Sequence, residues 1–425
     1  MRKVVVVGLG RSGIASARLL AEHGDTVFIT EIKDDSYIRA SLDSLIKDGV
    51  VERHNVELGE NSNRFIKDSD LMVISPGVRA DSEPVKIAER INIPVVSELE
   101  LASSVCLGPI IAVTGTSGKT TVITLIHKIL TRAGLDAILC GNIGNPLSGE
   151  IKRITKNTIV VLEVSSFQLE RIRSFKPKLS LILNISENHL DRHRDMEEYI
   201  YLKSRIFSNQ DEGSILFLNG KDKILKRLSR DITKLNVEFF DEYKGFSKRY
   251  NIENENFLAA MSVASEEGVN EGLMLEVISG FKGIEHRLEY VTTINEVDFI
   301  NDSKATTVSS VEWALKSLNG RIVLIMGGRY KGGDFARLKD FVKEKARSII
   351  AIGEARSRIK KDLSIFKDVI EEDDLNQAVH RAFENARTGD KILLSPGCSS
   401  FDMFKNYEER GRVFKEICLK MQGNT

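Results

Sequence analysis

The sequence is poor in cysteine, and the few cysteines form no recognisable motif. Its 425 residues include 4 cysteines, which are Cys106, Cys140, Cys398 and Cys418. None of them lie in a C-x-x-C spacing, so a zinc or redox site built on such a pair is excluded. Sparse, scattered cysteines are typical of proteins that work in a reducing cytosol.

The sequence also lacks an excess of charge of one sign and any long hydrophobic run. Lys and Arg together number 61, as do Asp and Glu, so the formal net charge is zero. No basic surplus would attract nucleic acid or an anionic membrane. The run "VVVV" at 4–7 is too short for a signal peptide, and no run approaches the roughly 18 apolar residues of a membrane span. We expect a cytoplasmic protein without a nucleic-acid or membrane partner.

What the chain does contain is an alternation of short apolar runs and amphipathic stretches. Seven of these runs are rich in β-branched residues and bounded by Gly, Ser or Pro, namely "KVVVVG", "DLMVIS", "IIAVTG", "TIVVLEVS", "LSLILN", "RIVLIMGG" and "KILLSP". They predict buried parallel strands with helices between them, and hence an α/β fold. Glycine-rich strand-to-helix junctions near residues 8, 115 and 327 suggest three doubly wound sheets. We expect three domains, covering residues 1–94, 95–284 and 285–425.

The stretch "VTGTSGKTT" at 113–121 has the context of a phosphate-binding loop, because it joins a strand to an amphipathic helix. Gly115 and Gly118 allow the backbone to approach phosphates, Lys119 can reach the β and γ phosphates, and Thr120 can bind Mg²⁺. The usual motif has a glycine five residues before Gly118, where this chain has Val113. The loop must therefore differ in curvature from that of common GTPases and motor proteins.

Two later segments offer metal ligands. Glu163 ends the strand in "TIVVLEVS", where the metal-binding carboxylate of a nucleotide site would lie, although alone it could be an ordinary exposed side chain. His189 follows the strand in "LILN", and His193 lies four residues further on, a spacing that a zinc pair would also have. Lys203, as an ammonium group, cannot bind Mg²⁺ and by itself suggests only a surface lysine.

Together these motifs resemble one family. The segments that carry the resemblance are "TGTSGKTT", "LEVSSFQLE", "NHLDRH", "YLKSRIF", "EHRLE", "NDSKATT" and "SPGCSSFDMFKNYEERG". They are similar to the Mur ligases of peptidoglycan synthesis, over all three expected domains, and "SSFQLE", "NDSKAT" and "DMFKNYEERG" are most similar to the D-glutamate-adding branch.

The resemblance implies an ATP-dependent amide ligase of cell-wall synthesis, and so of cell shape and division. It implies a Rossmann-like first domain, a central domain of the phosphate-loop ATPase type, and a Rossmann-like third domain. The substrates would be UDP-N-acetylmuramoyl-L-alanine, D-glutamate and ATP, with Mg²⁺, which we expect as two ions, and we expect a monomer.

The resemblance also assigns roles to residues. The catalytic group would be Lys119, His189, Lys203 and Lys331, with Lys203 carbamylated so that it becomes an anionic metal ligand. The metal ligands would be Thr120, Glu163, His189 and carbamylated Lys203. The ATP-binding residues would be Gly115, Thr116, Ser117, Gly118, Lys119, Thr120, Thr121, Asn256, Arg287 and Asp302. His286 and Lys304 match groups around the nucleotide and the cleft between domains. The substrate-binding residues would be Arg11, Ser12, Glu31, Ser75, Asn142, Ser165, Gln168, Thr306, Ser400, Phe401 and Tyr407.

Three other functions stay open. "GLGRSG" at 8–13 fits G-x-G-x-x-G after a strand, and Glu31 follows about twenty residues later, as in NAD-dependent oxidoreductases. A phosphate loop also occurs in regulatory ATPases that have no amino-acid substrate. A ligase with the same chemistry could use another amino acid or, as in folylpolyglutamate synthetase, a folate.

Overall fold

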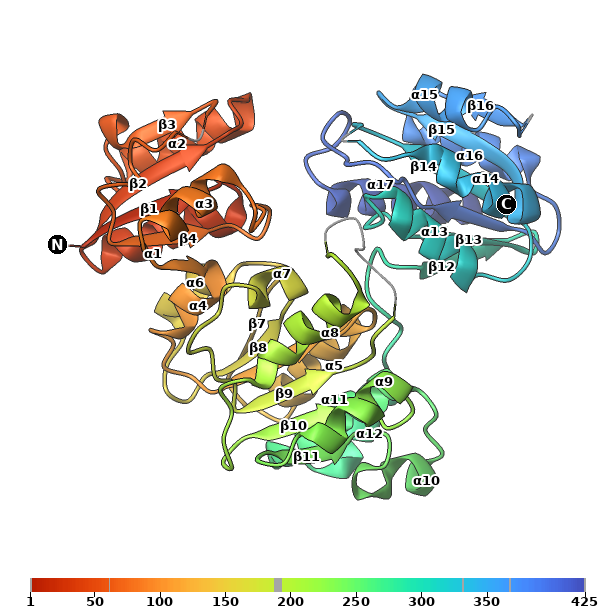
Figure 1. Ribbon diagram of the computed structural model, residues 1–425. Helices are drawn as coiled ribbons and strands as arrows, with labels where there is room; N and C mark the ends of the chain where they lie inside the picture. Colours follow the sequence, from red (N-terminus) through yellow and green to blue (C-terminus); the bar gives the residue numbers. More distant parts are fainter. Residues whose placement is uncertain (1, 61, 187–192, 331, 367, 424–425) are drawn as a thin grey trace. The chain divides into compact units, whose positions relative to one another are not determined.

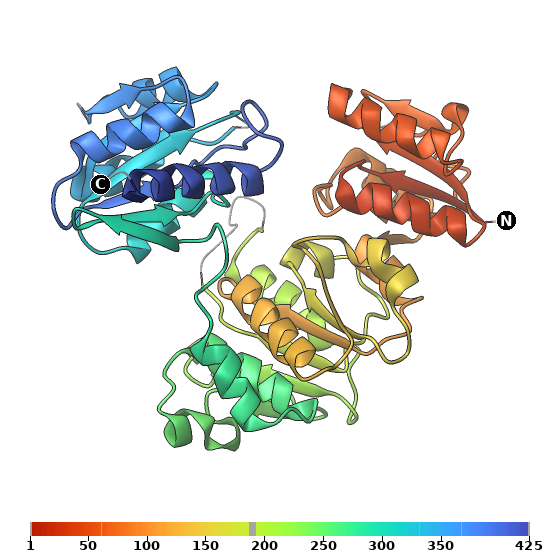
Figure 2. The same cartoon turned by 180° about the vertical axis from the view of Figure 1, so that it is seen from behind.

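Figure 1 shows a computed structural model of the chain, which describes residues 2–60, 62–186, 193–330, 332–366 and 368–423. Contacts between residues divide the chain into two compact units, residues 1–281 and residues 282–425. The first unit contains two sheets and the second contains one. Each sheet has helices packed on its faces, as Figure 2 shows from the opposite side.

The first sheet of unit 1 is five-stranded, in the order β3-β2-β1-β4-β5, and all of its pairs are parallel. Its strands are β1 (Lys3–Val7), β2 (Thr26–Glu31), β3 (Val56–Leu58), β4 (Leu71–Ile74) and β5 (Val95–Ser97). The four valines of β1 are buried, as expected for a strand with a helix on either face. Because β5 pairs with β4, this sheet extends beyond residue 94.

The second sheet of unit 1 is six-stranded and parallel, in the order β11-β10-β9-β6-β8-β7. Its strands are β6 (Ile110–Thr114), β7 (Ala137–Gly141), β8 (Ile159–Glu163), β9 (Leu179–Ile182), β10 (Ile215–Leu218) and β11 (Asn236–Phe239). Three helices pack together against one face and bury a continuous apolar core there: α5 (Lys119–Arg132), α11 (Glu255–Glu266) and α12 (Glu271–Ser279).

Unit 2 contains a six-stranded sheet in the order β12-β13-β17-β14-β15-β16, in which only the β12–β13 pair is antiparallel. Its strands are β12 (Glu289–Ile294), β13 (Val297–Asn301), β14 (Ile322–Gly327), β15 (Ala346–Ile352), β16 (Val369–Glu371) and β17 (Lys391–Leu394). Every residue of β14 is buried, because helices cover both faces of the sheet at this strand.

The helices that connect and cover these strands begin mostly at side-chain caps, such as Asp35, Asp195 and Asp374. The α-helices of unit 1 are α1 (Arg11–Glu22), α2 (Ser36–Lys47), α3 (Glu83–Arg90), α4 (Glu98–Ser103), α5 (Lys119–Arg132), α6 (Leu147–Glu150), α7 (Ser166–Leu169), α8 (Met196–Ser204), α9 (Lys223–Leu228), α10 (Phe246–Tyr250), α11 (Glu255–Glu266) and α12 (Glu271–Ser279). Those of unit 2 are α13 (Val308–Ser317), α14 (Lys339–Lys345), α15 (Arg356–Asp362), α16 (Leu375–Asn385) and α17 (Tyr407–Gly423).

The expected α/β class is confirmed, and each of the seven predicted apolar runs forms a strand. In parallel sheets the carboxyl ends of the strands meet at one edge, where ligands of open α/β sheets bind. The three glycine-rich junctions all lie at such an edge, after β1, β6 and β14. No helix within the described part of the chain is long and apolar enough to cross a membrane.

Candidate active site

The loop between β6 and α5 has the geometry of a tight phosphate-binding turn. Gly115 has φ 151° and Gly118 has φ 82°, both conformations that residues with side chains rarely adopt. A Cβ atom at Gly118 would lie 2.5 Å from Oδ1 of Asn256. Val113 is fully buried inside β6, so the turn begins only after Thr114. The unusual spacing of the motif therefore reflects a strand that continues where other phosphate loops already turn.

Hydrogen bonds within the phosphate loop and from the segment after β9 fix its conformation. Lys119 Nζ donates to the carbonyl oxygens of Gly115 and Thr116, at 2.8 and 3.1 Å. Asn184, just after β9, accepts the N–H of Ser117 through Oδ1 at 2.9 Å. The sequence interpretation missed Asn184, although its place directly after a buried strand was a usable signal.

Glu163 is the centre of the polar contacts beside the loop. Its side chain is almost fully buried, at 2% exposure. Oε2 accepts a hydrogen bond from Thr120 Oγ1 at 2.8 Å, and Oε1 accepts one from Asn142 Nδ2 at 2.9 Å. A carboxylate and a hydroxyl oxygen this close together at a helix N-terminus suit Mg²⁺, which prefers oxygen ligands and phosphate partners. The residues present therefore fit the expected cation, and the exposed-glutamate alternative is wrong.

Lys203 lies on α8 and is buried, with 2% exposure, so the prediction of a surface lysine is wrong. Its Nζ donates to Gly115 O at 2.9 Å and lies 4.6 Å from the centre of the Tyr199 ring. Burial, reinforced by the nearby charge of Lys119, holds the pKa of Lys203 well below its ordinary value, although Glu163 acts in the opposite direction. The family resemblance grouped Lys119, Glu163 and Lys203 in one site, and all three lie around the same loop.

Two of the other predicted residues lie outside the described chain, and three have partners around α7. His189 and Lys331 are both outside the described residues. His193 Nε2 lies 3.0 Å from Ser166 Oγ, and its ring stacks on Phe167. Ser165 and Gln168 bond to each other in a capping box at the start of α7. His193 and this capping box thus have well-defined structural partners.

The side chains of Glu31 and Ser75 hold the glycine-rich loop after β1 by hydrogen bonds to its backbone. Glu31 accepts the N–H of Leu9 at 2.6 Å through one oxygen and the N–H of Lys33 at 2.8 Å through the other. Ser75 Oγ donates to Gly8 O at 2.8 Å. A Cβ atom at residue 13 would lie 1.9 Å from Gly8 O, so this glycine is required for the close approach of α1.

A second loop, residues 141–146, joins β7 to α6 and contacts both the start of α1 and Glu163 beside the phosphate loop. Arg11, at the start of α1 beside the half-buried Ser12, donates from Nη1 to Gly144 O at 3.1 Å. Asn142 bonds to the Glu163 carboxylate with its side chain and to Glu163 O with its N–H, at 2.9 Å in both cases. A continuous series of contacts therefore runs from Arg11 to Thr120 within unit 1.

In unit 2, Asp302 lies at the carboxyl end of β13 and is buried. Ser395 Oγ and the N–H of Leu288 donate to its carboxylate at 2.8 and 3.2 Å. Burial outweighs these hydrogen bonds and raises the pKa of Asp302 to about 6. Arg287 also acts on this carboxyl group, lowering its pKa. These two predicted nucleotide contacts therefore lie close enough to influence each other.

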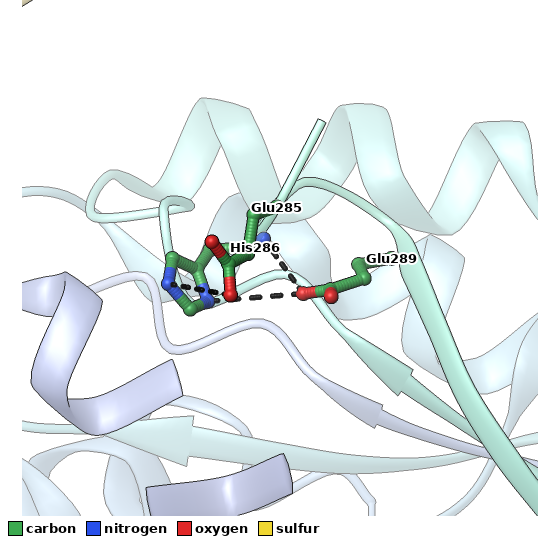
Figure 3. Close-up of side chains that lie close together, drawn as sticks. All are labelled: Glu285, His286 and Glu289. Atoms are coloured by element: carbon green, nitrogen blue, oxygen red, sulfur yellow. Dashed lines mark hydrogen bonds and ion pairs between the residues drawn. The ribbon is translucent and has the colours of Figure 1, made fainter. Parts of the chain in front are cut away.

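His286 belongs to a compact cluster of ionisable groups, shown in Figure 3. Its backbone has φ 64°, and its N–H donates to Glu289 Oε2 at 2.9 Å. Lys415 lies between the two acids of the cluster, 2.9 Å from Glu285 Oε1 and 2.6 Å from Glu289 Oε1. A cation is thus already supplied by the protein itself, which argues against a metal ion at this cluster.

Two of the residues expected to hold the acceptor amino acid, Thr306 and Ser400, follow the carboxyl ends of β13 and β17. Ser400 is buried, whereas Phe401 is 52% exposed. Thr306 is half-buried, and its loop is fixed by a hydrogen bond from Gly397 N to Ala305 O at 2.8 Å. Lys304 N donates to His286 O at 3.0 Å. The structure therefore brings the loop after β13 into contact with the loop after β17, although Ala305 and Gly397 are far apart in sequence.

Comparisons with known families match almost the whole chain. Residues 2–97 match the "Mur ligase MurD-like, N-terminal domain", residues 113–277 the "Mur ligase middle domain", and residues 286–398 the "Mur ligase, glutamate ligase domain".

Curated relatives match over the full length. The UDP-N-acetylmuramoylalanine–D-glutamate ligase of Chloroherpeton thalassium is 38% identical, across 99% of this chain and 98% of that protein. The ligase of the same name from Pelotomaculum thermopropionicum is also 38% identical, with the same coverage of both chains.

Solved structures share the fold. The UDP-N-acetylmuramate–alanine ligase of Thermotoga maritima has a TM-score of 0.55 at 19% identity, and the match covers 100% of each chain. The MurF ligase of the same organism, in complex with ADP, also has a TM-score of 0.55, at 14% identity, with 93% of this chain and 96% of that one covered. At such low identity these structures support the fold alone.

Proposed function

The chain belongs to the Mur ligase family, whose members are ATP-dependent amide ligases, and on that premise we propose that it joins D-glutamate to UDP-N-acetylmuramoyl-L-alanine. The products are the extended UDP-linked precursor of peptidoglycan, ADP and phosphate. The relatives that bear this activity in their names match both ends of the chain, which supports the same substrates here.

One structural observation carries the proposal beyond the family. The Glu163 carboxylate bonds to Thr120 of the phosphate loop and to Asn142 of the loop that Arg11 contacts. A ligase of this kind must hold a triphosphate next to the carboxylate end of a long UDP-linked substrate. The series of contacts from the β1 loop to the phosphate loop supports these two binding regions as parts of one site.

The reaction has two steps in this proposal. The carboxylate of the UDP substrate attacks the γ-phosphorus of ATP, ADP leaves, and an acyl phosphate forms. The amine of D-glutamate then attacks the acyl carbon, and the tetrahedral intermediate loses phosphate and a proton to give the amide. Both steps bring anions together, so positioning and positive charge should supply most of the rate enhancement. Lys119 and the N–H groups at the start of α5 serve this purpose.

Magnesium would be held by Thr120 and Glu163, together with His189 and a carbamate on Lys203. When bound, magnesium would neutralise part of the charge of the phosphates. The lowered pKa of Lys203 supports carbamylation, because only a neutral amine can add to CO₂, with release of one proton. The resulting carbamate would lie close to Lys119. It would replace the buried ammonium group of Lys203 with an anion that can bind a metal.

The remaining contacts complete the proposal. The adenine nucleotide would bind at Gly115, Thr116, Ser117, Gly118, Thr121, Asn256, Arg287 and Asp302. The UDP substrate would bind at Arg11, Ser12, Glu31, Ser75, Asn142, Ser165 and Gln168. D-Glutamate would bind at Thr306, Lys331, Ser400, Phe401 and Tyr407. We propose a monomer in the cytoplasm, and the free state of all four cysteines is consistent with a reducing compartment.

The test is phosphate release from MgATP with UDP-N-acetylmuramoyl-L-alanine, with and without each of several amino acids. Release that needs the UDP substrate and responds most to D-glutamate is the expected result. A stronger response to another amino acid would keep the ligase and change its acceptor. Release that is indifferent to both substrates would contradict the ligase and favour a regulatory ATPase.

The role of Lys203 has a separate test. Lys203→Ala should abolish measurable activity, and a short carboxylate such as formate should restore part of it, because the carboxylate replaces the missing carbamate. The matched control is Lys178→Ala, which removes a lysine paired with Glu267 on the same domain and should leave activity unchanged. Full activity of Lys203→Ala without added carboxylate would remove Lys203 from the site.

A further inference from the structure

Arg410 lies on α17 and is the most completely buried large cation of unit 2, with 1% exposure. Its guanidinium donates only to neutral oxygens. Nη2 donates to Ser303 O at 2.8 Å, Nε donates to Ser303 Oγ at 3.0 Å, and both Nη atoms lie 3.3 Å from Cys398 O. Nη1 also reaches Gly327 O at 3.5 Å. Among the residues that the structure describes, no carboxylate forms an ion pair with it.

This arrangement is unusual, because buried charges are normally paired with an opposite charge. Asp402 acts on Arg410 only at longer range, and its carboxylate accepts the N–H of Glu354 at 3.0 Å instead. Burial lowers the pKa of Arg410 to about 10, so the guanidinium still carries its charge at neutral pH. The carbonyl oxygens around the guanidinium must therefore compensate its positive charge.

Those carbonyl oxygens belong to three different loops at one edge of the sheet. Ser303 follows β13, Gly327 ends β14, and Cys398 follows β17. Ser303 and Cys398 lie a few residues before Thr306 and Ser400, which we expect to hold the acceptor amino acid. Arg410 is therefore bonded to the base of all three loops.

The same loops also bond to one another around the guanidinium. Gly327 N donates to Pro396 O at 2.8 Å, and Arg329 N donates to Ser399 O at 2.9 Å. Gly328 has φ 129°, and a Cβ atom there would lie 2.3 Å from Ser399 O and 3.2 Å from Arg410 Nη1. The loops thus pack so closely on the guanidinium that no side chain fits between them.

We propose that Arg410 is a positioning residue for the acceptor amino acid, holding the loops after β13, β14 and β17 in the arrangement that binds an anionic acceptor. This inference rests on the proposed function. Lysine is not an equivalent replacement, because its compact ammonium group lacks the extended planar fork of donors that reaches Ser303, Gly327 and Cys398 together. A positive charge at the base of these loops also favours an acidic acceptor.

The experiment compares Arg410→Lys with a control variant at a second arginine of unit 2. Arg410→Lys keeps the charge and removes the fork of donors. Arg347→Met, the control, breaks the ion pair between Arg347 and Asp390, which lies at the amino ends of β15 and β17, away from the acceptor loops. For each variant, the KM values for D-glutamate, MgATP and the UDP substrate are measured, together with kcat and the midpoint of thermal unfolding.

Arg410→Lys should raise the KM for D-glutamate at least tenfold, with the KM values for MgATP and the UDP substrate within twofold of the original. Arg347→Met should lower the unfolding midpoint with no change in any KM. If Arg410→Lys changes only the midpoint, or weakens all three substrates equally, the role is merely structural and the inference is overturned. If the unmodified protein shows no phosphate release dependent on the UDP substrate, the proposed function itself has failed, and the inference fails with it.

Discussion

Gly118 and Gly134 offer a direct test of the phosphate loop at the scale of single residues. They lie just before and just after α5, with similar φ angles of 82° and 79°. Alanine at either position should cost about 1 kcal/mol in the free energy of unfolding, because both require a left-handed backbone. Only at Gly118 would the new Cβ meet another group, Oδ1 of Asn256, whereas nothing lies within 4 Å at Gly134.

We therefore expect Gly118→Ala to raise the KM for MgATP several-fold and Gly134→Ala to leave it unchanged. Steady-state kinetics, combined with urea unfolding of both variants, separates the two effects. Equal KM values for the two variants would show that the loop tolerates a side chain at its tightest point.

Asp302 should make the stability of the protein depend on pH. Its pKa is raised from 3.8 unfolded to about 6 folded, so the folded state binds more protons between these values. The contribution of this proton to the free energy of unfolding is therefore fully present below pH 4. About 3 kcal/mol of it is lost as the pH rises to about 6. Asp302→Asn cannot titrate, so its free energy of unfolding relative to the unmodified protein should rise over this interval. Urea unfolding at pH 4 and pH 7 measures this difference, and a constant difference would contradict the raised pKa.

The sequence could predict that residues tied to a local motif lie together. Lys119, Thr120 and Glu163 do so, and each stands at a fixed place in a strand–turn–helix pattern. The place of Arg410 could not be predicted, because this residue lies in the charged stretch "YEERGR", where nothing local separates a buried arginine from exposed neighbours. Its burial depends largely on contacts with Ser303 and Gly327, which lie 107 and 83 residues away in sequence. Such contacts leave no mark on the surrounding sequence.

At the scale of elements, the strands predicted from the sequence are those buried on both faces. The runs "KVVVV" and "IVLIM" show a continuous apolar pattern for this reason. The edge strands β3 and β16 are only three residues long and partly polar, and their sequences carry no such pattern. The hairpin of β12 and β13 had a usable signal, because Asn295 and Glu296 form its turn with positive φ angles of 48° and 60°.

The start of the short helix α6 is held by a side chain from another helix, α4. Glu98, on α4, is 1% exposed, and its Oε1 accepts the N–H of Ser148 at 2.8 Å and Ser148 Oγ at 2.7 Å. These donors belong to the start of α6, directly after the 141–146 loop that carries Asn142. Glu98 thus acts as a cap that fixes the end of this loop.

Glu98→Ala should lower the free energy of unfolding by roughly 1–3 kcal/mol, because the N–H of Ser148 is left unpaired. It should also raise the KM for the UDP substrate, since the Asn142 loop loses its anchor, whereas Glu98→Gln retains an acceptor and should preserve both properties. The control is Glu100→Ala, on the same helix, which releases the N–H groups of Arg173 and Phe175 at a different loop. A similar rise in KM for both alanine variants would show that the effect is general destabilisation.

At the scale of the whole molecule, three sheets form only two compact units. The reason is a shared core in unit 1. Leu19 and Leu20 of α1, beside the first sheet, belong to the same apolar cluster as Leu101 of α4 and Leu147 of α6, beside the second. The glycine-rich junctions indicated the number of sheets, but local patterns do not reveal which helices of different sheets pack on each other.

This shared core leads to a prediction about where the chain can be divided. A cut after Phe281 separates no core, because the Phe281 ring packs with Phe257 and lies under the Lys128 ammonium, both within unit 1. Fragments 1–281 and 282–425 should therefore each fold and unfold cooperatively. Fragment 1–94 should not, because it exposes Leu19 and Leu20 and also lacks β5. Circular dichroism during urea unfolding and amide NMR dispersion distinguish the three fragments. Cooperative unfolding of fragment 1–94, with a midpoint equal to that of fragment 1–281, would show that the first sheet does not depend on the shared core.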